Sequence, residues 1–382
     1  MIANDIYYIG VNDKTLDLFE GQYQIPNGIA YNSYVIMDDE IVVMDTVDKR
    51  KSQEYLKNLE KVLDGKTPDY LVISHLEPDH ASSIQDLVDK YPDITLVSNA
   101  KTFQMLPQFF HSGLGKTAVV KEGDTLELGH HTLTFVMAPM VHWPEVMMTY
   151  DKNAKVLFSA DAFGKFGSLD VKEPWDDEAR RYYFNIVGKY GPQVQAVLKK
   201  AAALEIDAIC PLHGPVLKDS IGHVLNLYQI WSSYDAESKG VLVAYASLHG
   251  NTAKGAQRLA EILREKGCAN VELMDLARCD GSKALENAFR YDRMVLAASS
   301  YNAGVVPYME DFLHHLKGKN FQKRTVALVE NASWAPSAVR TMKDILSQMK
   351  DITVVEPAVT IRGVVKDSDI QAFEQLAERL IG

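Results

Sequence analysis

Three continuous apolar runs in the last third of the chain constrain its fold most strongly. The runs at 241–245, 294–297 and 325–329 are hydrophobic except for Thr325, and a helical stretch follows each of them. Strands of this kind are buried on both faces, and their alternation with helices predicts a parallel, doubly wound α/β sheet. Because the hydrophobic period changes at about residue 238, we predict one domain at 1–237 and a second at 238–382.

The first predicted domain has a different pattern, with much antiparallel sheet among its helices. Apolar residues at 31–46 flank the polar run 38–40 and indicate a hairpin. A second pair of strands, 146–150 and 154–159, turns at 152–153. Single strands are predicted at 70–73, 125–128 and 208–210, and helices at 53–63, 81–90, 179–203 and 216–234. These elements predict a mixed α+β domain.

Length and composition narrow the class of protein. At 382 residues the chain is longer than one hydrophobic core ordinarily serves. A net charge of -11 argues against non-specific binding to nucleic acid, which needs clustered Lys and Arg. No apolar run approaches the roughly 20 residues that span a bilayer, and the N-terminus lacks the features of a secretory signal. We therefore expect a cytoplasmic protein that does not enter a membrane.

A cluster of His and acidic residues follows the strand predicted at 70–73. Four potential metal ligands fall within six residues at a turn from strand to helix: His75, Glu77, Asp79 and His80. Three more stand at loop-like positions further on: His142, Asp161 and His213. Each alone has a plain structural explanation, such as a hydrogen-bonded core histidine or a helix cap. Together, seven ligands of only two types at strand ends predict a metal site.

The residue types in this cluster favour iron. The chain has only three cysteines and no Cys-x-x-Cys pair, so imidazole and carboxylate must hold the metal. The ligands divide into His75, Glu77 and His142 for one ion, Asp79, His80 and His213 for the other, and Asp161 as a bridge. Two imidazoles and a terminal carboxylate per ion are typical of non-haem iron that keeps positions open for a small substrate. In this scheme Glu77, Asp79 and Asp161 keep the reduced ions stable.

The order His-x-Glu-x-Asp-His, followed by His142, Asp161 and His213, resembles the metallo-β-lactamase-like domain of flavodiiron proteins. The segments 157–164 and 211–215 resemble the same family. This resemblance implies an N-terminal αββα sandwich that carries a di-iron site. Zinc hydrolases of the superfamily usually have His where this chain has Glu77, and carboxylate is a harder ligand that favours iron.

Three predicted strand ends in the second domain suit a flavin. The first combines hydroxyls, a glycine and backbone N–H groups at a helix N-terminus, which can cradle a phosphate without Lys or Arg. The other two add aromatic rings and small polar groups, as expected beyond the carboxyl ends of parallel strands. The candidate contacts are Ser247, Leu248, His249, Gly250, Asn251, Thr252, Ser299, Ser300, Tyr301, Asn302, Ala303, Gly304, Asn331, Ala332, Ser333 and Trp334.

The second domain resembles flavodoxin, whose cofactor is FMN. It departs from the pattern in detail, because the second loop lacks the commoner Pro after its serines and the third has Ala335 and Pro336 where glycines are frequent. A Gly-x-Gly-x-x-Gly fingerprint is absent, which speaks against a dinucleotide cofactor. The departures leave FMN as the expected cofactor but do not fix which atoms contact it.

The two resemblances cover essentially the whole chain in the domain order of flavodiiron proteins. They imply an oxidoreductase in which FMN takes electrons from a small redox protein such as rubredoxin and passes them to two irons, which reduce O2 to water or NO to nitrous oxide. They also imply a head-to-tail homodimer that places the FMN of one protomer beside the irons of the other. Because the chain ends at Gly382 without a cysteine-rich module, we expect the donor to be a separate protein.

Two other functions fit parts of the pattern. A binuclear zinc hydrolase with a regulatory flavodoxin-like domain would use the same ligands, although Glu77 argues against it. An electron-transfer or scaffold protein with a vestigial metal site would not need all seven. Tyr31 and Tyr182 are candidates for groups that support the metal site or donate protons, but plain packing is the commoner role for either.

Overall fold

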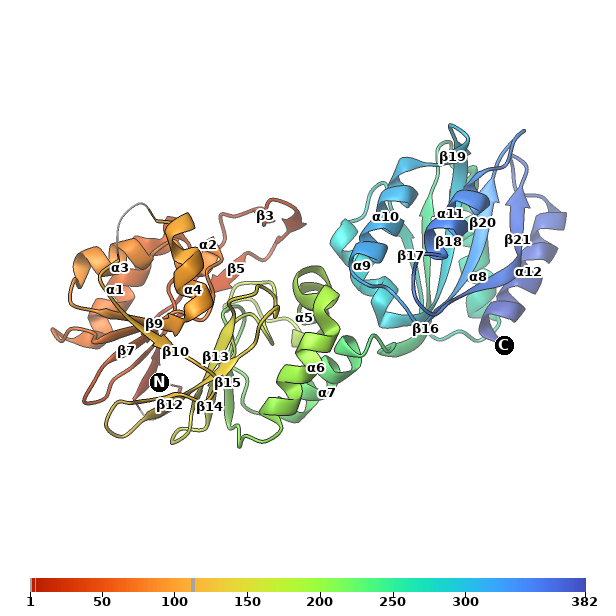
Figure 1. Cartoon of the computed structure of the whole chain (residues 1–382). Coiled ribbons are helices and arrows are strands. Elements are labelled where there is room, and N and C mark those ends of the chain that lie inside the picture. The colour runs from red at the N-terminus through yellow and green to blue at the C-terminus, as the bar shows by residue number, and fades with distance from the viewer. Residues whose placement is uncertain (1, 4, 111–113) are drawn as a thin grey trace. The chain divides into compact units, whose positions relative to one another are not determined.

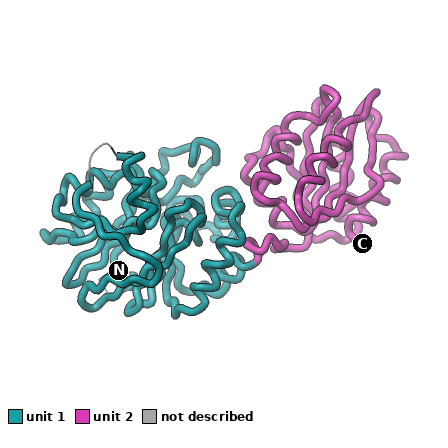
Figure 2. The backbone as a smooth tube through the Cα atoms, viewed as in Figure 1, with its two compact units in different colours: residues 1–229 teal, residues 230–382 magenta. Residues whose placement is uncertain are grey.

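The computed structural model describes residues 2–3, 5–110 and 114–382, and the chain forms two compact units. The first unit spans Met1–Gln229 and the second spans Ile230–Gly382 (Figure 1 and Figure 2). The predicted boundary between 237 and 238 lies near the start of the second unit, and it stays a prediction of where independently folding domains meet. None of the described helices is long and apolar enough to cross a membrane.

The first unit contains two sheets. The strand order is β1-β6-β7-β8-β9-β10 in one and β11-β12-β13-β14-β15 in the other, and two short ribbons, β2-β5 and β3-β4, stand apart. The strands are β1 Ile6–Tyr8, β2 Val11–Asp13, β3 Leu18–Phe19, β4 Tyr23–Gln24, β5 Ile29–Tyr31, β6 Tyr34–Ile36, β7 Val42–Met44, β8 Tyr70–Val72, β9 Thr95–Asn99, β10 Lys116–Val120, β11 Thr125–Glu127, β12 Thr132–Met137, β13 Met147–Asp151, β14 Val156–Phe158 and β15 Ala208–Cys210. Both predicted strand pairs are antiparallel: β6 with β7, and β13 with β14.

The core of this unit lies between the two sheets. Buried side chains from β7 and β8, such as Met44 and Val72, belong to one cluster with Phe135 and Phe158 from the other sheet. Helices cover the outer faces (Figure 1). They are α1 Ser52–Leu63, α2 Pro78–Ala81, α3 Ile84–Lys90, α4 Ala100–Met105, α5 Trp175–Tyr182, α6 Gly191–Ala201 and α7 Ile221–Ser232, with 3-10 turns η1 Lys49–Lys51 and η2 Leu106–Gln108. This is the αββα sandwich that the family resemblance implies.

The second unit is a parallel sheet with helices on both faces. Its strand order is β17-β16-β18-β20-β21, and β19 pairs antiparallel with β18. The strands are β16 Ser238–Ala246, β17 Val271–Asp275, β18 Tyr291–Tyr301, β19 Gly304–Val305, β20 Arg324–Asn331 and β21 Ile352–Ile361; the helices are α8 Asn251–Glu265, α9 Gly281–Arg290, α10 Pro307–Gly318, α11 Ala338–Leu346 and α12 Asp367–Ile381. Apolar residues of α8 recur at Ala256, Leu259, Ala260 and Leu263, the spacing of a helix that buries one side. The predicted doubly wound sheet is confirmed.

Two predicted helices are divided more finely than their hydrophobic period indicates. The stretch 81–90 is preceded by the separate short helix α2, in which Pro78 takes the first helical position. The stretch 179–203 is interrupted by a π-helical turn, η3 Tyr183–Val187, and a 3-10 turn, η4 Gly188–Tyr190. A hydrophobic period does not distinguish these turns from a continuous α-helix, and π-helical turns occur often at functional sites.

Candidate metal centre and flavin loops

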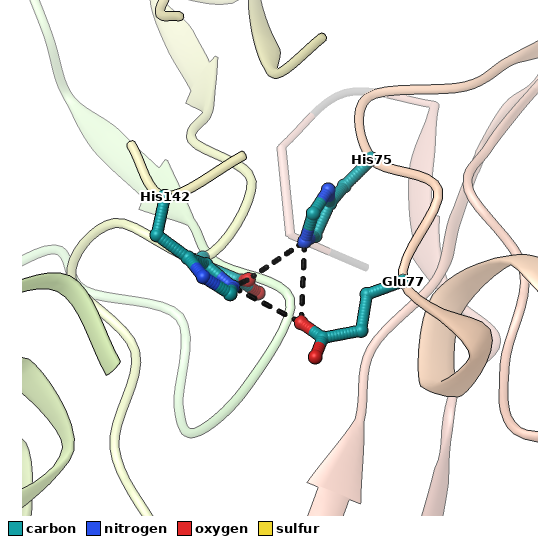
Figure 3. Close-up of side chains that lie close together, drawn as sticks. His75, Glu77 and His142 are labelled. Carbon is teal, nitrogen blue, oxygen red and sulfur yellow. Dashed lines mark hydrogen bonds and ion pairs between the residues drawn. The ribbon is translucent and has the colours of Figure 1, made fainter. Parts of the chain in front are cut away.

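Loops at the ends of strands bring the seven predicted metal ligands together. The segment after β8 supplies four of them, and α2 is part of it. His142 lies between β12 and β13, Asp161 follows β14, and His213 follows β15. All seven side chains are buried except that of Glu77, which is partly exposed. Figure 3 shows His75, Glu77 and His142 pointing toward one another.

The seven side chains form two adjacent groups of ligand atoms, each within 4.8 Å. One group is His75, Glu77, His142 and Asp161, and the other is Asp79, His80 and His213. Oδ2 of Asp161 lies 3.1 Å from Nε2 of His142 and 3.4 Å from Nε2 of His75. Oδ1 of Asp161 lies 3.2 Å from Nε2 of His80, in the other group. A carboxylate with one oxygen toward each group has the geometry of a bridging ligand.

Several buried ligand atoms in the centre lack a hydrogen-bond partner. Nδ1 of His213 donates to the carbonyl oxygen of Ala30 at 2.8 Å, which leaves its Nε2 as an acceptor, 3.1 Å from Nε2 of His80. Both oxygens of Asp79 and of Asp161 are buried without a partner in hydrogen-bonding geometry among the described residues, although imidazole nitrogens lie nearby. Such buried atoms are rare in folded proteins. Cations between them would satisfy them, so these residues fit a pair of metal ions.

The charges of the cluster also favour a cation. Burial, joined by the charges of Glu77 and Asp161, raises the pKa of Asp79 to about 7 against the attraction of His80. Burial lowers the pKa of His213 and so favours the neutral imidazole, which is the form that binds metals. Burial also opposes the charge of His142, but its contacts with Asp161 and Glu77 prevail and raise its pKa to about 9. Ion binding must therefore displace protons, as is usual for metal sites.

Asn32 holds the loop that carries His213. It is fully buried, and its Nδ2 donates to the carbonyl oxygens of Pro211 at 2.8 Å and Gly214 at 2.7 Å. Its backbone N–H donates to the carbonyl oxygen of Leu212 at 2.8 Å. These bonds fix the backbone on both sides of the histidine. This role was not predicted, because an Asn at the second position of the predicted hairpin gives no sign of a partner about 180 residues away.

Glu145 plays a similar part for His75. Its Oε1 accepts from Nδ1 of His75 at 2.7 Å and from the backbone N–H of Leu76 at 3.0 Å. Such a contact fixes the tautomer of a metal-binding imidazole and leaves its Nε2 free for the ion. Glu145 was not predicted from the sequence either, although a carboxylate three residues after His142 at the start of an apolar strand was a usable signal.

The two tyrosines suggested from the sequence both lie against His213. The ring centroids are 6.0 Å away for Tyr31 and 5.4 Å for Tyr182. Burial raises the pKa of each phenol well above its ordinary value, so both keep their protons at neutral pH. Nη2 of Arg50 donates to the hydroxyl of Tyr31 at 3.0 Å. A role in proton donation stays a prediction for both.

The first two predicted flavin loops are joined to each other. The strands β16, β18 and β20 are neighbours and parallel, so their carboxyl ends share one edge of the sheet. Gly250 has a φ of +86° at the start of α8, and its N–H donates to Oγ of Ser247 at 3.1 Å. The hydroxyl oxygens of Thr252 and Ser299 lie 2.9 Å apart. A side chain at Gly250 would meet nothing within 4 Å, so no described protein atom covers this position at the start of the helix.

The second and third loops are also joined. The second is a hairpin between β18 and β19, with Asn302 and Ala303 in the left-handed region at φ values of +46° and +58°. Oγ of Ser300 accepts from the backbone N–H of Ser337, which follows the third loop, at 2.9 Å. In the third loop, Nδ2 of Asn331 donates to the carbonyl oxygen of Gly363 at 2.8 Å. This bond adds a fourth strand end, after β21, which was not predicted from the sequence.

Large apolar side chains stand uncovered on these loops. Leu248 and Tyr301 are each 45% exposed and Trp334 is 83% exposed. Clustered exposed apolar groups usually mark a binding site. With an open helix N-terminus beside them, they fit a cofactor that joins a phosphate to a planar ring.

Comparison with known proteins identifies the class. Residues 29–214 match the ODP family beta lactamase model, and residues 242–364 match a flavodoxin domain. The anaerobic nitric oxide reductase flavorubredoxin of Escherichia coli (strain SMS-3-5 / SECEC) is 30% identical over 354 residues, which cover 89% of this chain and 73% of that relative. The chain is therefore an oxidoreductase that combines a metallo-β-lactamase-like domain with a flavodoxin-like domain.

Solved structures agree over the full length. Rubredoxin oxygen:oxidoreductase from Desulfovibrio gigas matches with a TM-score of 0.92 and 27% identity, covering 100% of this chain and 97% of that one. The flavodiiron protein from Giardia intestinalis matches with a TM-score of 0.92 and 26% identity, covering 99% and 95%. The chain belongs to the flavodiiron protein family. This membership confirms the predicted cofactors, FMN and a di-iron centre, while the residues that hold them stay a prediction.

Proposed function

We propose that this chain reduces O2 to water, NO to nitrous oxide, or both, at a di-iron centre held by the seven predicted ligands. The observation that carries the proposal is the position of Asp161, a buried carboxylate that turns one oxygen to each group of ligands. The names of the relatives support both substrates, since one is a nitric oxide reductase and another an oxygen oxidoreductase.

Each ligand group has a defined task in this proposal. His75, Glu77 and His142 hold one ion, Asp79, His80 and His213 hold the other, and Asp161 spans them. When bound, two ferrous ions supply electrons and open positions for a diatomic substrate. The carboxylates offset the positive charge of the pair. Tyr31 and Tyr182, which keep their protons next to His213, stand where protons are consumed.

Both reactions need a supply of electrons. Reduction of O2 to two waters consumes four electrons and four protons, and joining two NO into nitrous oxide and water consumes two of each. We infer that FMN, with its phosphate at the start of α8 and its ring beside Trp334, receives these electrons from a separate cytoplasmic redox protein such as rubredoxin. A head-to-tail homodimer would bring the FMN of one protomer to the irons of its partner.

Metal analysis combined with anaerobic turnover tests the proposal. Protein made without excess zinc should be yellow, contain two irons and one FMN per chain, and consume O2 or NO when supplied with reduced rubredoxin. Protein that holds two zinc ions and has no reductase turnover would contradict the proposal and favour the zinc hydrolase.

A further inference from the structure

The two ligand groups are alike in their own atoms but differ in what stands behind them. Each has two imidazoles and one carboxylate besides the shared Asp161. Behind His75 lies a carboxylate, with Nδ1 2.7 Å from Oε1 of Glu145. Behind His213 lies a backbone carbonyl, with Nδ1 2.8 Å from the oxygen of Ala30. A carboxylate brings a full negative charge, whereas a carbonyl brings only a dipole.

Glu145 is held as an ionised acceptor. Its side chain is fully buried, and Oε1 accepts from the N–H of Leu76 as well as from His75. Two N–H donors on one oxygen favour the charged form of a carboxylate. Oε2 has no hydrogen-bond partner among the described residues. Its backbone is fixed as well, because Nδ2 of Asn99 donates to its carbonyl oxygen at 2.7 Å.

Other carboxylates also act on the centre, among them Glu20, which acts on Glu77 and His142. Nδ1 of His80 is buried without a hydrogen-bond partner among the described residues. The other buried carboxylate nearby is Asp45, whose Oδ1 accepts from the N–H of Ser74 at 2.7 Å. The charge of Asp45 acts on one imidazole of each group, on His80 more than on His75. Glu145 is hydrogen-bonded to a ligand of one group alone.

We propose that Glu145 makes the iron held by His75, Glu77 and His142 the harder of the two to reduce. This inference rests on the proposed function. A hydrogen bond from imidazole to carboxylate makes the imidazole a stronger electron donor, which stabilises the ferric ion. With two irons bound, the ion held by His75, Glu77 and His142 would then have the lower of the two reduction potentials, and the ion held by Asp79, His80 and His213 the higher.

Glu145→Gln tests the proposal, because Gln retains an oxygen that accepts from His75 and Leu76 but removes the charge. In a redox titration of the whole protein, the lower of the two iron potentials should shift to a more positive value and the higher one should stay. The two iron potentials then lie closer together. The maximum amount of the Fe(II)Fe(III) state reached during the titration, measured by integrated EPR, should therefore fall. The two FMN potentials provide an internal reference.

Glu330→Gln is a matched control in the second unit. Glu330 is also a buried carboxylate that accepts a backbone N–H, from Val339 at 3.0 Å. Its neutralisation should leave both iron couples in place. An equal shift of both iron couples in Glu145→Gln, or no shift in protein that retains two irons, would overturn the proposal.

The wild-type protein tests the proposal even if Glu145→Gln binds iron poorly. Its iron pair must titrate as two resolved one-electron couples, and a single unresolved couple would also overturn the inference. The proposed function fails by a different result, which is the absence of iron or of reductase turnover in the wild type. Two irons, normal turnover and unresolved couples would contradict the inference on Glu145 alone.

Discussion

Asp161 and Trp334 illustrate how differently the two candidate sites are built at the same kind of position, a loop after a strand. Asp161 is fully buried and contributes a side-chain oxygen to each ligand group, whereas Trp334 is 83% exposed and presents a ring face. The metal site depends on which side chains are present. The flavin site depends more on the backbone conformation at residues such as Gly250. A substitution should therefore affect the two sites for different physical reasons, and the sites should fail separately.

The largest expected effect is that of Asp79→Ala. Removal of a buried ligand should empty the iron site and lower O2 and NO turnover by more than about 100-fold, the upper range seen for residues that merely support metal ligands. The flavin spectrum should persist, because the predicted flavin contacts lie in the other unit. Iron analysis, absorbance spectra and anaerobic turnover measure the three quantities.

Asp170→Ala controls for a lost acidic residue in the same unit, since Asp170 is exposed and its side chain contacts Lys14 and Ser168, neither of which is a predicted ligand. It should keep iron and activity. Loss of FMN together with iron in Asp79→Ala would contradict the separation of the two sites.

The next effect is that of Gly250→Leu on the flavin. A Cβ here meets nothing within 4 Å, so strain of the left-handed backbone at a φ of +86°, rather than crowding within the protein, is the cause. That strain costs about 1–2 kcal/mol, and a side chain would also enter the space in front of the N–H groups. FMN affinity should fall by about 10-fold or more, measured by fluorescence titration, while iron remains.

Gly267→Leu separates strain from ligand contact. Gly267 also has a left-handed backbone, with a φ of +88°, and equally open space, but it lies beyond the other end of α8. It should lower the free energy of unfolding by a similar amount and keep FMN affinity. An equal loss of FMN affinity in both variants would mean that general destabilisation of the second unit, and not ligand contact at Gly250, causes the loss.

Mixed dimers should show a smaller effect. Their activity, counted per pair of one intact iron site and one intact flavin site, should stay within about twofold of the wild type. A dimer of one Asp79→Ala chain and one Gly250→Leu chain retains intact iron in one protomer and intact flavin in the other. If the cofactors meet across a head-to-tail interface, the hybrid should regain activity that neither parent has. Isolated hybrids that contain both cofactors but stay inactive, or active protein that is monomeric, would contradict transfer between protomers.

The sequence predicted candidate metal ligands better than the contacts around them. Seven candidates were chosen because His and carboxylate at strand ends are informative by type alone, and the structure brings all seven into two adjacent groups. Asn32 and Glu145 were missed because each acts on a segment remote in sequence, and a lone polar residue does not reveal its partner. In the second unit the strand ends were predicted from the doubly wound pattern, but the hairpin at 302–303 depends on backbone angles that no residue type there requires.

The smallest predicted effect concerns the stability of the first unit. It tests whether the two units respond separately to pH as well as to substitution. Away from the metal site, Nδ1 of His131 lies 2.5 Å from Oδ2 of Asp151, and both residues are buried. The hydrogen bond to Asp151 raises the pKa of His131 above its ordinary value of about 6.5, against the opposing effect of burial. A raised pKa means that the folded state binds the proton more tightly than the unfolded state does.

The stabilisation from His131 is therefore complete below about pH 6.5 and is lost as the pH rises through the folded-state pKa. Urea unfolding should show a decrease of about 1 kcal/mol in the free energy of unfolding of the first unit across that range, which is the typical net contribution of one intramolecular hydrogen bond. The measurement belongs in the iron-free Asp79→Ala protein, where proton release by metal binding does not interfere. His131→Gln in that background should be less stable at low pH and lose the decrease, while FMN release, which reports on the second unit, should be unaffected. A decrease of the same size in His131→Gln would assign the pH dependence to other groups.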